Sequence, residues 1–116
     1  MKRIAKPTLI ALALLVSGSA LASGDIAAGK DKATTCAACH GTDGNATDPQ
    51  YPRLAGQWDN YLLQALKEYK SGQRKNPIMM GFASNLSEQD MEDLASYFSS
   101  LPGKLDDLSR HVQGSD

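Results

Sequence analysis

The sequence has few of the residues that stabilise small folds by themselves. It contains only two cysteines, Cys36 and Cys39, and seven aromatic side chains in 116 residues. Two cysteines are too few for the disulfide framework that staples secreted mini-proteins. Lys and Arg number 12 against 13 Asp and Glu, so the sequence lacks the basic excess of a nucleic-acid-binding protein. Its length fits one domain.

No apolar run reaches the roughly 20 residues that a membrane-spanning helix needs. The N-terminal run, Leu9 to Val16, follows three basic residues and precedes the small-x-small pattern Ala20-Leu21-Ala22. This arrangement is typical of a secretory signal peptide, whereas an uncleaved anchor would need a longer run. We therefore expect residues 1–22 to be cleaved after Ala22, leaving an exported, periplasmic protein with nine basic and 13 acidic residues.

The remaining sequence has helical periodicity and no alternating strand pattern. The apolar spacing predicts a first helix from Asp25 to about Thr35, a middle helix from Trp58 to Tyr69, and a last helix that Ser87 caps. We expect the apolar face of the middle helix, Trp58 included, to be buried. Pro102 and Gly103 end the last helix, so a domain over 23–103 precedes a polar, mobile tail over 104–116.

Two long stretches between these helices are rich in Gly, Pro, Asn and Asp. They run from His40 to Gly56 and from Gln73 to Asn85. Irregular loops of this length are uncommon in a small domain unless they have a function. Because so short a chain buries only a modest apolar core, we expect the loops to wrap a bound group that completes it.

The run Cys36-Ala37-Ala38-Cys39-His40 has the spacing CxxCH. Two thiols at positions i and i+3 lie on one side of a helical turn, where they can add to the two vinyl groups of a haem. The next residue brings its imidazole under the iron. The motif therefore predicts one covalent haem c, held by Cys36 and Cys39, with His40 as the proximal iron ligand.

Three other interpretations of the cysteine pair have less support. A zinc site needs two further nitrogen or sulfur ligands, and the only other histidine is His111, in the polar tail. A thioredoxin-like redox pair is expected in a βαβ unit, and the sequence shows no such pattern. A disulfide between Cys36 and Cys39 would close a very small loop and stabilise little.

A haem with a proximal histidine also predicts a soft ligand downstream, on a segment that reaches its opposite face. Met79 and Met80 lie between Pro77 and Gly81, in the second long stretch. Their spacing alone does not choose between them. Met91 falls on the apolar stripe of the last helix, where methionine usually fills the core.

Five runs of the sequence together resemble the class I bacterial c-type cytochromes. They are GDIAAGK from Gly24, CAACHGTDGN from Cys36, YPRLAGQ from Tyr51, YLLQALKEYKSGQRKNP from Tyr61 and LSEQDMEDLASYF from Leu86. The similarity is greatest to one haem domain of the periplasmic dihaem cytochromes and to short soluble monohaem cytochromes. Because only one CxxCH is present, the resemblance implies one haem.

The resemblance implies an all-α fold, with about three main helices and loops wrapped around the covalent haem. In this family the first and last helices cross at a small residue, which here places Gly29 against Tyr97 and Phe98. A proline carbonyl in the loop after the haem motif accepts the N–H of the proximal histidine, and the matching residue is Pro52. Such a bond fixes the imidazole and raises its basicity.

The family pattern also bears on the second ligand and on the haem propionates. Counted back from Leu86, the ligand methionine of the resembling domains falls at Met79, with Met80 as the runner-up. Three further residues are candidates to approach the propionates, namely Arg53, Gln57 and Trp58.

Ligation by both His and Met leaves no open position on the iron, and thioether coordination raises the reduction potential. This predicts a single-electron carrier and not an enzyme. Its partners would be a terminal oxidase, a reductase or a quinol-oxidising complex, and it would act as a monomer or weak dimer. The alternative is a haem enzyme or sensor with a labile sixth ligand, for which the sequence shows no distal histidine or arginine pattern.

Charge is unevenly distributed along the chain. Five basic and two acidic residues lie from Arg53 to Lys75, against two basic and seven acidic from Glu88 to Asp116. We hypothesise that four basic residues near the ligand loop orient a redox partner, although a solvated helix face explains them equally well. They are Lys67, Lys70, Arg74 and Lys75.

Overall fold

Helices form all the regular structure of residues 24–104, the part of the chain that the computed structural model describes. The elements are α1 (Ile26–Lys32), the 3-10 turn η1 (Ala33–Thr35), α2 (Ala37–His40), α3 (Asp59–Ser71), α4 (Pro77–Ser84) and α5 (Glu88–Ser100). None of the helices in this range is long and apolar enough to cross a bilayer. The expected signal peptide, and the expected tail beyond residue 104, lie outside the described residues.

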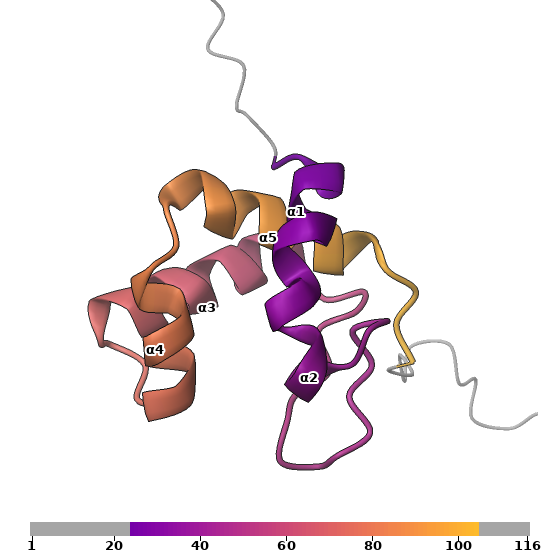
Figure 1. The fold of residues 1–116 in the computed structure, drawn as a ribbon, viewed down its shortest axis with the longest axis horizontal. Coiled ribbons are helices and arrows are strands. Elements are labelled where there is room, and N and C mark those ends of the chain that lie inside the picture. Colours follow the sequence, from indigo (N-terminus) through magenta and orange to yellow (C-terminus); the bar gives the residue numbers. More distant parts are fainter. Residues whose placement is uncertain (1–23, 105–116) are drawn as a thin grey trace, which may run out of the picture.

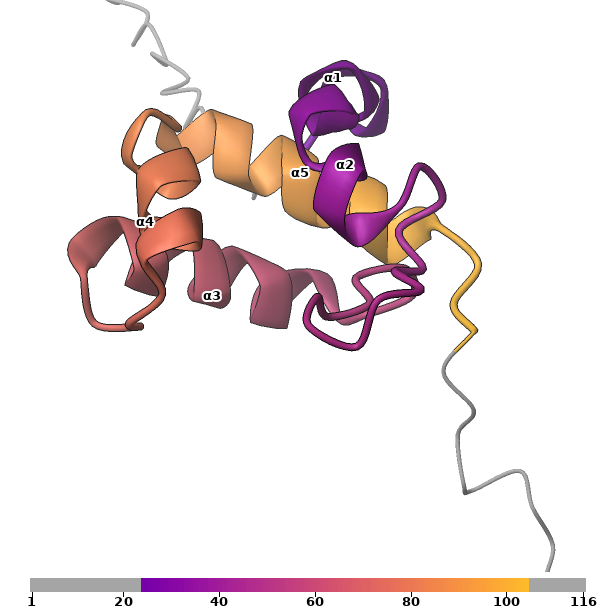
Figure 2. The same cartoon turned by 60° about the horizontal axis from the view of Figure 1, so that its bottom comes forward.

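The last helix is the centre of the arrangement. It crosses α1 on one side and lies along α3 on the other, while α4 packs against α3 near one end (Figures 1 and 2). One cluster of buried apolar side chains joins η1, α3 and α5, and consists of Ala33, Leu62, Leu94, Ala95 and Phe98. The all-α prediction is therefore confirmed.

Two glycines allow α1 and its preceding residue to approach α5 closely. A Cβ atom on Gly29 would lie 2.7 Å from Cβ of Tyr97 and still closer to the carbonyl oxygen of Asp93, and one on Gly24 would meet the backbone of Glu92. The helical cost of Gly29, about 1 kcal/mol relative to alanine, is thus explained by the crossing. The expected contact with Tyr97 is present, and Asp93 is a further neighbour.

A buried carboxylate links α1 to α5 at this crossing. Asp93, which is 2% exposed, accepts from the backbone N–H of Asp25 at 2.7 Å, from Lys32 Nζ at 2.5 Å and from Gln89 Nε2 at 2.8 Å. These bonds hold the pKa of Asp93 well below its usual value, at about 2, with the Lys32 ammonium as the largest cause. The periodicity of α5 alone does not distinguish this residue from a surface aspartate.

The two later helices begin at side-chain caps. Asn76 is the N-cap of α4, and its side-chain oxygen accepts from the N–H groups of Ile78 and Met79. Ser87 and Asp90 form a reciprocal capping box at the start of α5, as the sequence predicts. Such caps satisfy backbone donors that have no partner inside the helix.

Three sequence expectations are corrected by the structure. The first helix is interrupted: α1 ends at Lys32, and the cysteine motif lies on the separate short helix α2. The stretch from Gln73 to Asn85 is not irregular, because Asn76 caps α4 there and Pro77 occupies its first turn, where a missing N–H costs nothing. Only the stretch after His40 remains a long loop.

The third correction concerns Trp58, which is 77% exposed although it continues the apolar stripe of α3. Trp58 is the N-cap, with φ −60° and ψ 131°. This extended conformation takes its side chain out of the helical register. The helical period therefore does not apply to it.

Candidate haem-binding site

A cavity of about 430 Å³ lies between η1, α2, the long loop after His40, and the helices α3, α4 and α5. This volume is within the usual range for cofactor and ligand sites, about 300–1,000 Å³. Its wall is largely apolar and includes Leu54, Leu62, Ala65, Leu66, Leu94, Ala95 and Phe98. The four residues predicted to hold a haem, Cys36, Cys39, His40 and Met79, all line it as well.

The cysteine motif is presented to the cavity by α2. Cys36 is the N-cap of this short helix, and its carbonyl accepts the N–H of His40 at 2.9 Å. Both cysteines are free thiols, and burial raises the pKa of the Cys36 thiol because a thiolate loses solvation there. Gly41, with φ 85°, then ends the helix in a conformation that residues with a Cβ rarely adopt.

His40 is fixed by the long loop. It is 5% exposed, and its Nδ1 donates to the carbonyl oxygen of Pro52 at 2.8 Å. The ring of Tyr51 meets the imidazole edge-on, with centroids 6.5 Å apart. Nε2 is therefore the nitrogen whose lone pair remains available for a metal. The family expectation for Pro52 matches this geometry.

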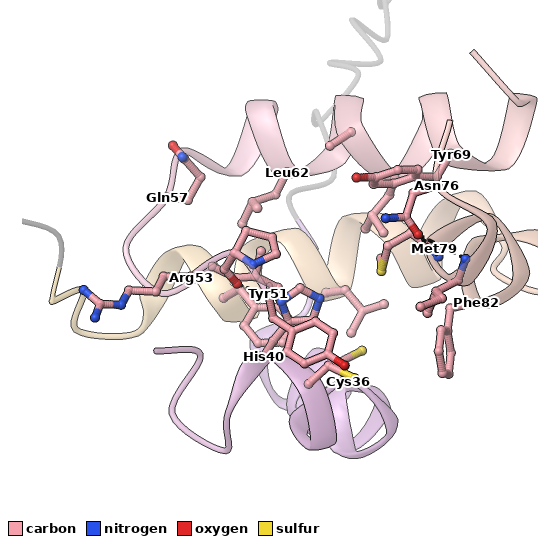
Figure 3. Close-up of a pocket in the computed structure, with 18 of the residues that line it drawn as sticks. Cys36, His40, Tyr51, Arg53, Gln57, Leu62, Tyr69, Asn76, Met79 and Phe82 are labelled. Atoms are coloured by element: carbon pink, nitrogen blue, oxygen red, sulfur yellow. Dashed lines mark hydrogen bonds between the residues drawn. The ribbon is translucent and has the colours of Figure 1, made fainter. Parts of the chain in front are cut away.

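Of the two adjacent methionines, Met79 faces the cavity. It lies in the first turn of α4, and Figure 3 shows its sulfur directed toward the space beside His40 and Cys36. Met80 is absent from the lining of this cavity. Its methyl group lies instead near Gly72, 3.8 Å from where a Cβ on that glycine would be. Residues one apart on a helix point about 100° apart, so only one of the two reaches the cavity.

The three residues expected near the propionates do not behave alike. Arg53 and Gln57 line the cavity at the side away from Met79 (Figure 3), and Arg53 Nε donates to the carbonyl of Ala46 at 3.2 Å. Trp58 does not line it. The expectation for Trp58 is therefore not supported by its position.

Sequence reasoning missed several polar residues of the cavity wall. Tyr51, Tyr61, Tyr69, Arg74 and Asn76 all line it. The helical period predicts that Tyr61 and Tyr69 lie on a buried face, but Tyr61 is 49% exposed in the structure. Asn76 falls in the stretch expected to be irregular. The helical period of α3 does show that Tyr61 and Tyr69 share a face, but it gives no sign of what that face meets.

Most of the basic residues near the second ligand have partners within the chain. Lys67 Nζ pairs with Glu88 at 2.7 Å, and Arg74 Nε with Glu68 at 3.2 Å. Lys70 donates to the carbonyl of Leu86. These contacts give three of the four residues a structural role, and recognition of a redox partner stays a prediction.

The alternative uses of the cysteines find no support in the described residues. Residues 24–104 hold no group of three or more His, Cys, Asp or Glu side chains placed to bind a metal ion together. The same residues form no strand, so the βαβ setting of a thioredoxin-like pair is missing from this part of the chain.

Comparison with known proteins assigns the chain to a family. The family model described as Cytochrome c matches residues 26–102, and the chain belongs to the cytochrome c family. It is 49% identical over 89 residues to cytochrome c4 of Pseudomonas aeruginosa, covering 77% of this chain and 44% of that protein. It is also 49% identical over 81 residues to cytochrome c-554(548) of Halomonas halodenitrificans, covering 67% of this chain and 98% of that protein.

A solved structure gives the same result for the fold. Reduced recombinant cytochrome c4 from Pseudomonas stutzeri superposes with a TM-score of 0.67 and 45% identity, over 71% of this chain and 48% of that one. The chain thus spans about half the length of the cytochrome c4 relatives it matches. The resemblance to one haem domain of a class I c-type cytochrome is confirmed.

The cofactor follows from the family and from the residues. Cytochrome c proteins carry covalent haem c, and this chain has two free thiols and a buried histidine at the CxxCH spacing. The cavity that they line has a largely apolar wall. These residues fit haem c.

Proposed function

We propose that this chain is a periplasmic single-electron carrier whose haem iron is bound by His40 on one side and Met79 on the other. The observation that carries the proposal is the position of these two side chains on one apolar cavity. Haem supplies a one-electron iron couple, whose potential depends on its axial ligands. The residues of this chain orient the ligands and exclude water.

The proximal side is prepared by the Pro52 carbonyl. Because Nδ1 donates there, the neutral imidazole presents the lone pair of Nε2, and a carbonyl partner makes that nitrogen a stronger donor. Burial of His40 at 5% exposure keeps solvent from replacing it. Cys36 and Cys39 would form the thioether links and so keep the group attached beside α2.

The distal side is prepared by α4. Asn76 accepts the N–H of Met79 at 3.1 Å, so the ligand residue is held in the first turn of a capped helix. A soft thioether on the iron favours the reduced form and raises the potential. With His40 and Met79 both bound to the iron, no position would remain for a substrate, which supports a carrier over an enzyme.

The apolar wall contributes to the rate of electron transfer. Leucine, alanine and phenylalanine side chains make up much of the lining. Groups of this kind cannot reorient around a change of charge as water does. We therefore expect little reorganisation of the site when one electron enters or leaves.

The setting and partners belong to the same proposal. The basic start, apolar run and small-x-small pattern of residues 1–22 support export with cleavage after Ala22. An oxidase, a reductase or a quinol-oxidising complex would exchange electrons with the protein. Lys67, Lys70, Arg74 and Lys75 remain the predicted orienting charges.

A visible spectrum of the exported protein, combined with a haem assay after denaturation, tests cofactor, attachment and ligation together. We expect one haem per chain that acid solvent does not extract, and a weak red charge-transfer band in the ferric state. The ferrous protein should not bind carbon monoxide rapidly at neutral pH. Rapid binding would instead support an enzyme or sensor with a labile sixth ligand.

A further inference from the structure

The side chain of Arg74 is held against α3 by three residues. Its guanidinium carbon lies 5.7 Å from the ring centroid of Tyr61 and 5.4 Å from that of Tyr69. Its Nε donates to Glu68 Oε2 at 3.2 Å, and its backbone N–H donates to the carbonyl of Glu68 at 3.1 Å. A planar guanidinium can stack on aromatic rings and bind a carboxylate at once, which an ammonium group cannot do with the same geometry.

These contacts fix the short turn that leads to the second ligand. Gly72, the C-cap that follows α3, has φ 81°, and Arg74 lies two residues later. Asn76, two residues further on, accepts the N–H of Met79 and begins α4. Between the end of α3 and the cap of α4, Arg74 bonds to Glu68 of α3 through both its side chain and its backbone, and the N–H of Gln73 donates to Ser71 Oγ at 3.4 Å. Arg74 and Met79 also line the same cavity.

We propose that Arg74 is a positioning residue for Met79: its contacts with Tyr61, Tyr69 and Glu68 hold the start of α4 so that the methionine sulfur stays beside the cavity. The inference rests on the proposed function, because it concerns the residue proposed to bind the iron. We call these contacts of Arg74 the clamp. Without the clamp, the turn between α3 and α4 moves away from α3 more often. Met79 then leaves the iron more readily, and an external ligand competes with it better.

The test is the affinity of the ferric protein for imidazole, which has to displace the methionine. Arg74→Gln removes the partly desolvated cation–π contacts with the tyrosines. If that loss falls on the Met79–iron bond, imidazole affinity rises about five- to thirtyfold. We expect this increase in Arg74→Gln, together with a weaker red charge-transfer band. Arg74→Lys keeps the charge but not the planar stacking. The logarithm of its imidazole affinity should therefore lie closer to that of Arg74→Gln than to that of the wild type.

Two controls separate positioning from charge and from general stability. Lys75→Gln removes the same charge one residue away and should leave imidazole affinity unchanged. Gly29→Ala destabilises the fold at the α1–α5 crossing, and should lower the unfolding midpoint without changing imidazole affinity. A second clamp variant, Glu68→Gln, should raise the affinity in the same direction as Arg74→Gln but by a smaller factor.

The outcomes distinguish this inference from the proposed function. If the wild-type ferric protein has the thioether band, and Arg74→Gln and Glu68→Gln both bind imidazole as the wild type does, only the role of Arg74 is overturned. An equal gain of affinity in Lys75→Gln or Gly29→Ala would overturn it too. If the wild type lacks the band, the methionine ligation itself is wrong, and the positioning role is overturned with it.

Discussion

The imidazole of His40 donates from Nδ1 to the carbonyl oxygen of Pro52, 2.8 Å away. The two residues are 12 positions apart and belong to different parts of the cavity wall, α2 and the long loop. One bond therefore fixes the tautomer of the proximal ligand and ties the loop to the motif helix. The backbone carbonyl of residue 52 makes this contact, so the side chain of Pro52 acts only through the shape of the loop.

Pro52→Ala should accordingly preserve the proximal ligand. The alanine carbonyl can accept the same bond, while the unfolded chain gains conformational freedom, so the free energy of unfolding should fall by about 0.4–1 kcal/mol. Denaturant unfolding measures this loss, and voltammetry should find the reduction potential close to that of the wild type. A fall in potential as large as that of a ligand variant would mean that the proline ring itself holds the carbonyl in place.

Met79→Ala and Met80→Ala form a matched pair, because they make the same chemical change at adjacent positions. Met79 lines the cavity and Met80 does not. Met79→Ala should abolish the red charge-transfer band of the ferric protein, lower the reduction potential and open the iron to external ligands. Met80→Ala should keep the band. The reverse result would make Met80 the ligand and leave the electron-transfer function standing.

Gly29→Ala should destabilise the protein although alanine is the better helix former. The added Cβ would lie 2.7 Å from Cβ of Tyr97, and such overpacking costs about 1–3 kcal/mol, more than the gain of about 1 kcal/mol in helix propensity. Gly81→Ala is the control, because a Cβ there meets no atom of the described residues within 4 Å. Thermal unfolding should give a lower midpoint for Gly29→Ala only, and equal midpoints would contradict the close crossing.

Asp93→Asn tests the buried link between α1 and α5 through its pH dependence. The folded pKa of Asp93, about 2, lies below its usual 3.8. A depressed carboxyl pKa contributes stability that is present above the unfolded pKa and is lost as pH falls through the folded one. At pH 7 the variant should melt below the wild type. The difference in melting temperature between the two proteins should shrink as the pH falls from about 5 to about 2. A difference that stays constant would mean that the charge of Asp93 is unimportant.

The triple variant Cys36→Ser, Cys39→Ser, His40→Ala should be largely unfolded without haem. The apolar residues that line the cavity lose the group that they would pack against, and a domain of this size has little other core. Circular dichroism of the haem-free chain should show much less helix than the wild type. Native helix content in that variant would contradict the view that haem completes the core.

The amino-acid sequence by itself determined the local features of this protein. The capping box of Ser87 and Asp90 depends on residues three apart, and so does the placing of two thiols on one helical turn. The CxxCH motif identified the cofactor because five consecutive residues contain both thiols for covalent attachment and the imidazole that would bind the iron. The helical period also located α3 and α5 close to their observed bounds.

Only the tertiary structure decided which residues meet across the cavity. Met79 and Met80 have the same chemistry, and the direction of α4 against α3 separates them. The helix α4 is a different case, because its start is local: Asn76 accepts from two N–H groups within three residues, and the pair Asn76-Pro77 is itself a sequence signal for the start of a helix. The sequence predicts no internal partner for Arg74, which it places among the charges expected to orient a redox partner, and it does not distinguish Asp93 from a surface aspartate. A sequence pattern records which face a residue is on and not what packs there. Contacts between distant segments are set by the packing of whole helices, and no local pattern encodes them.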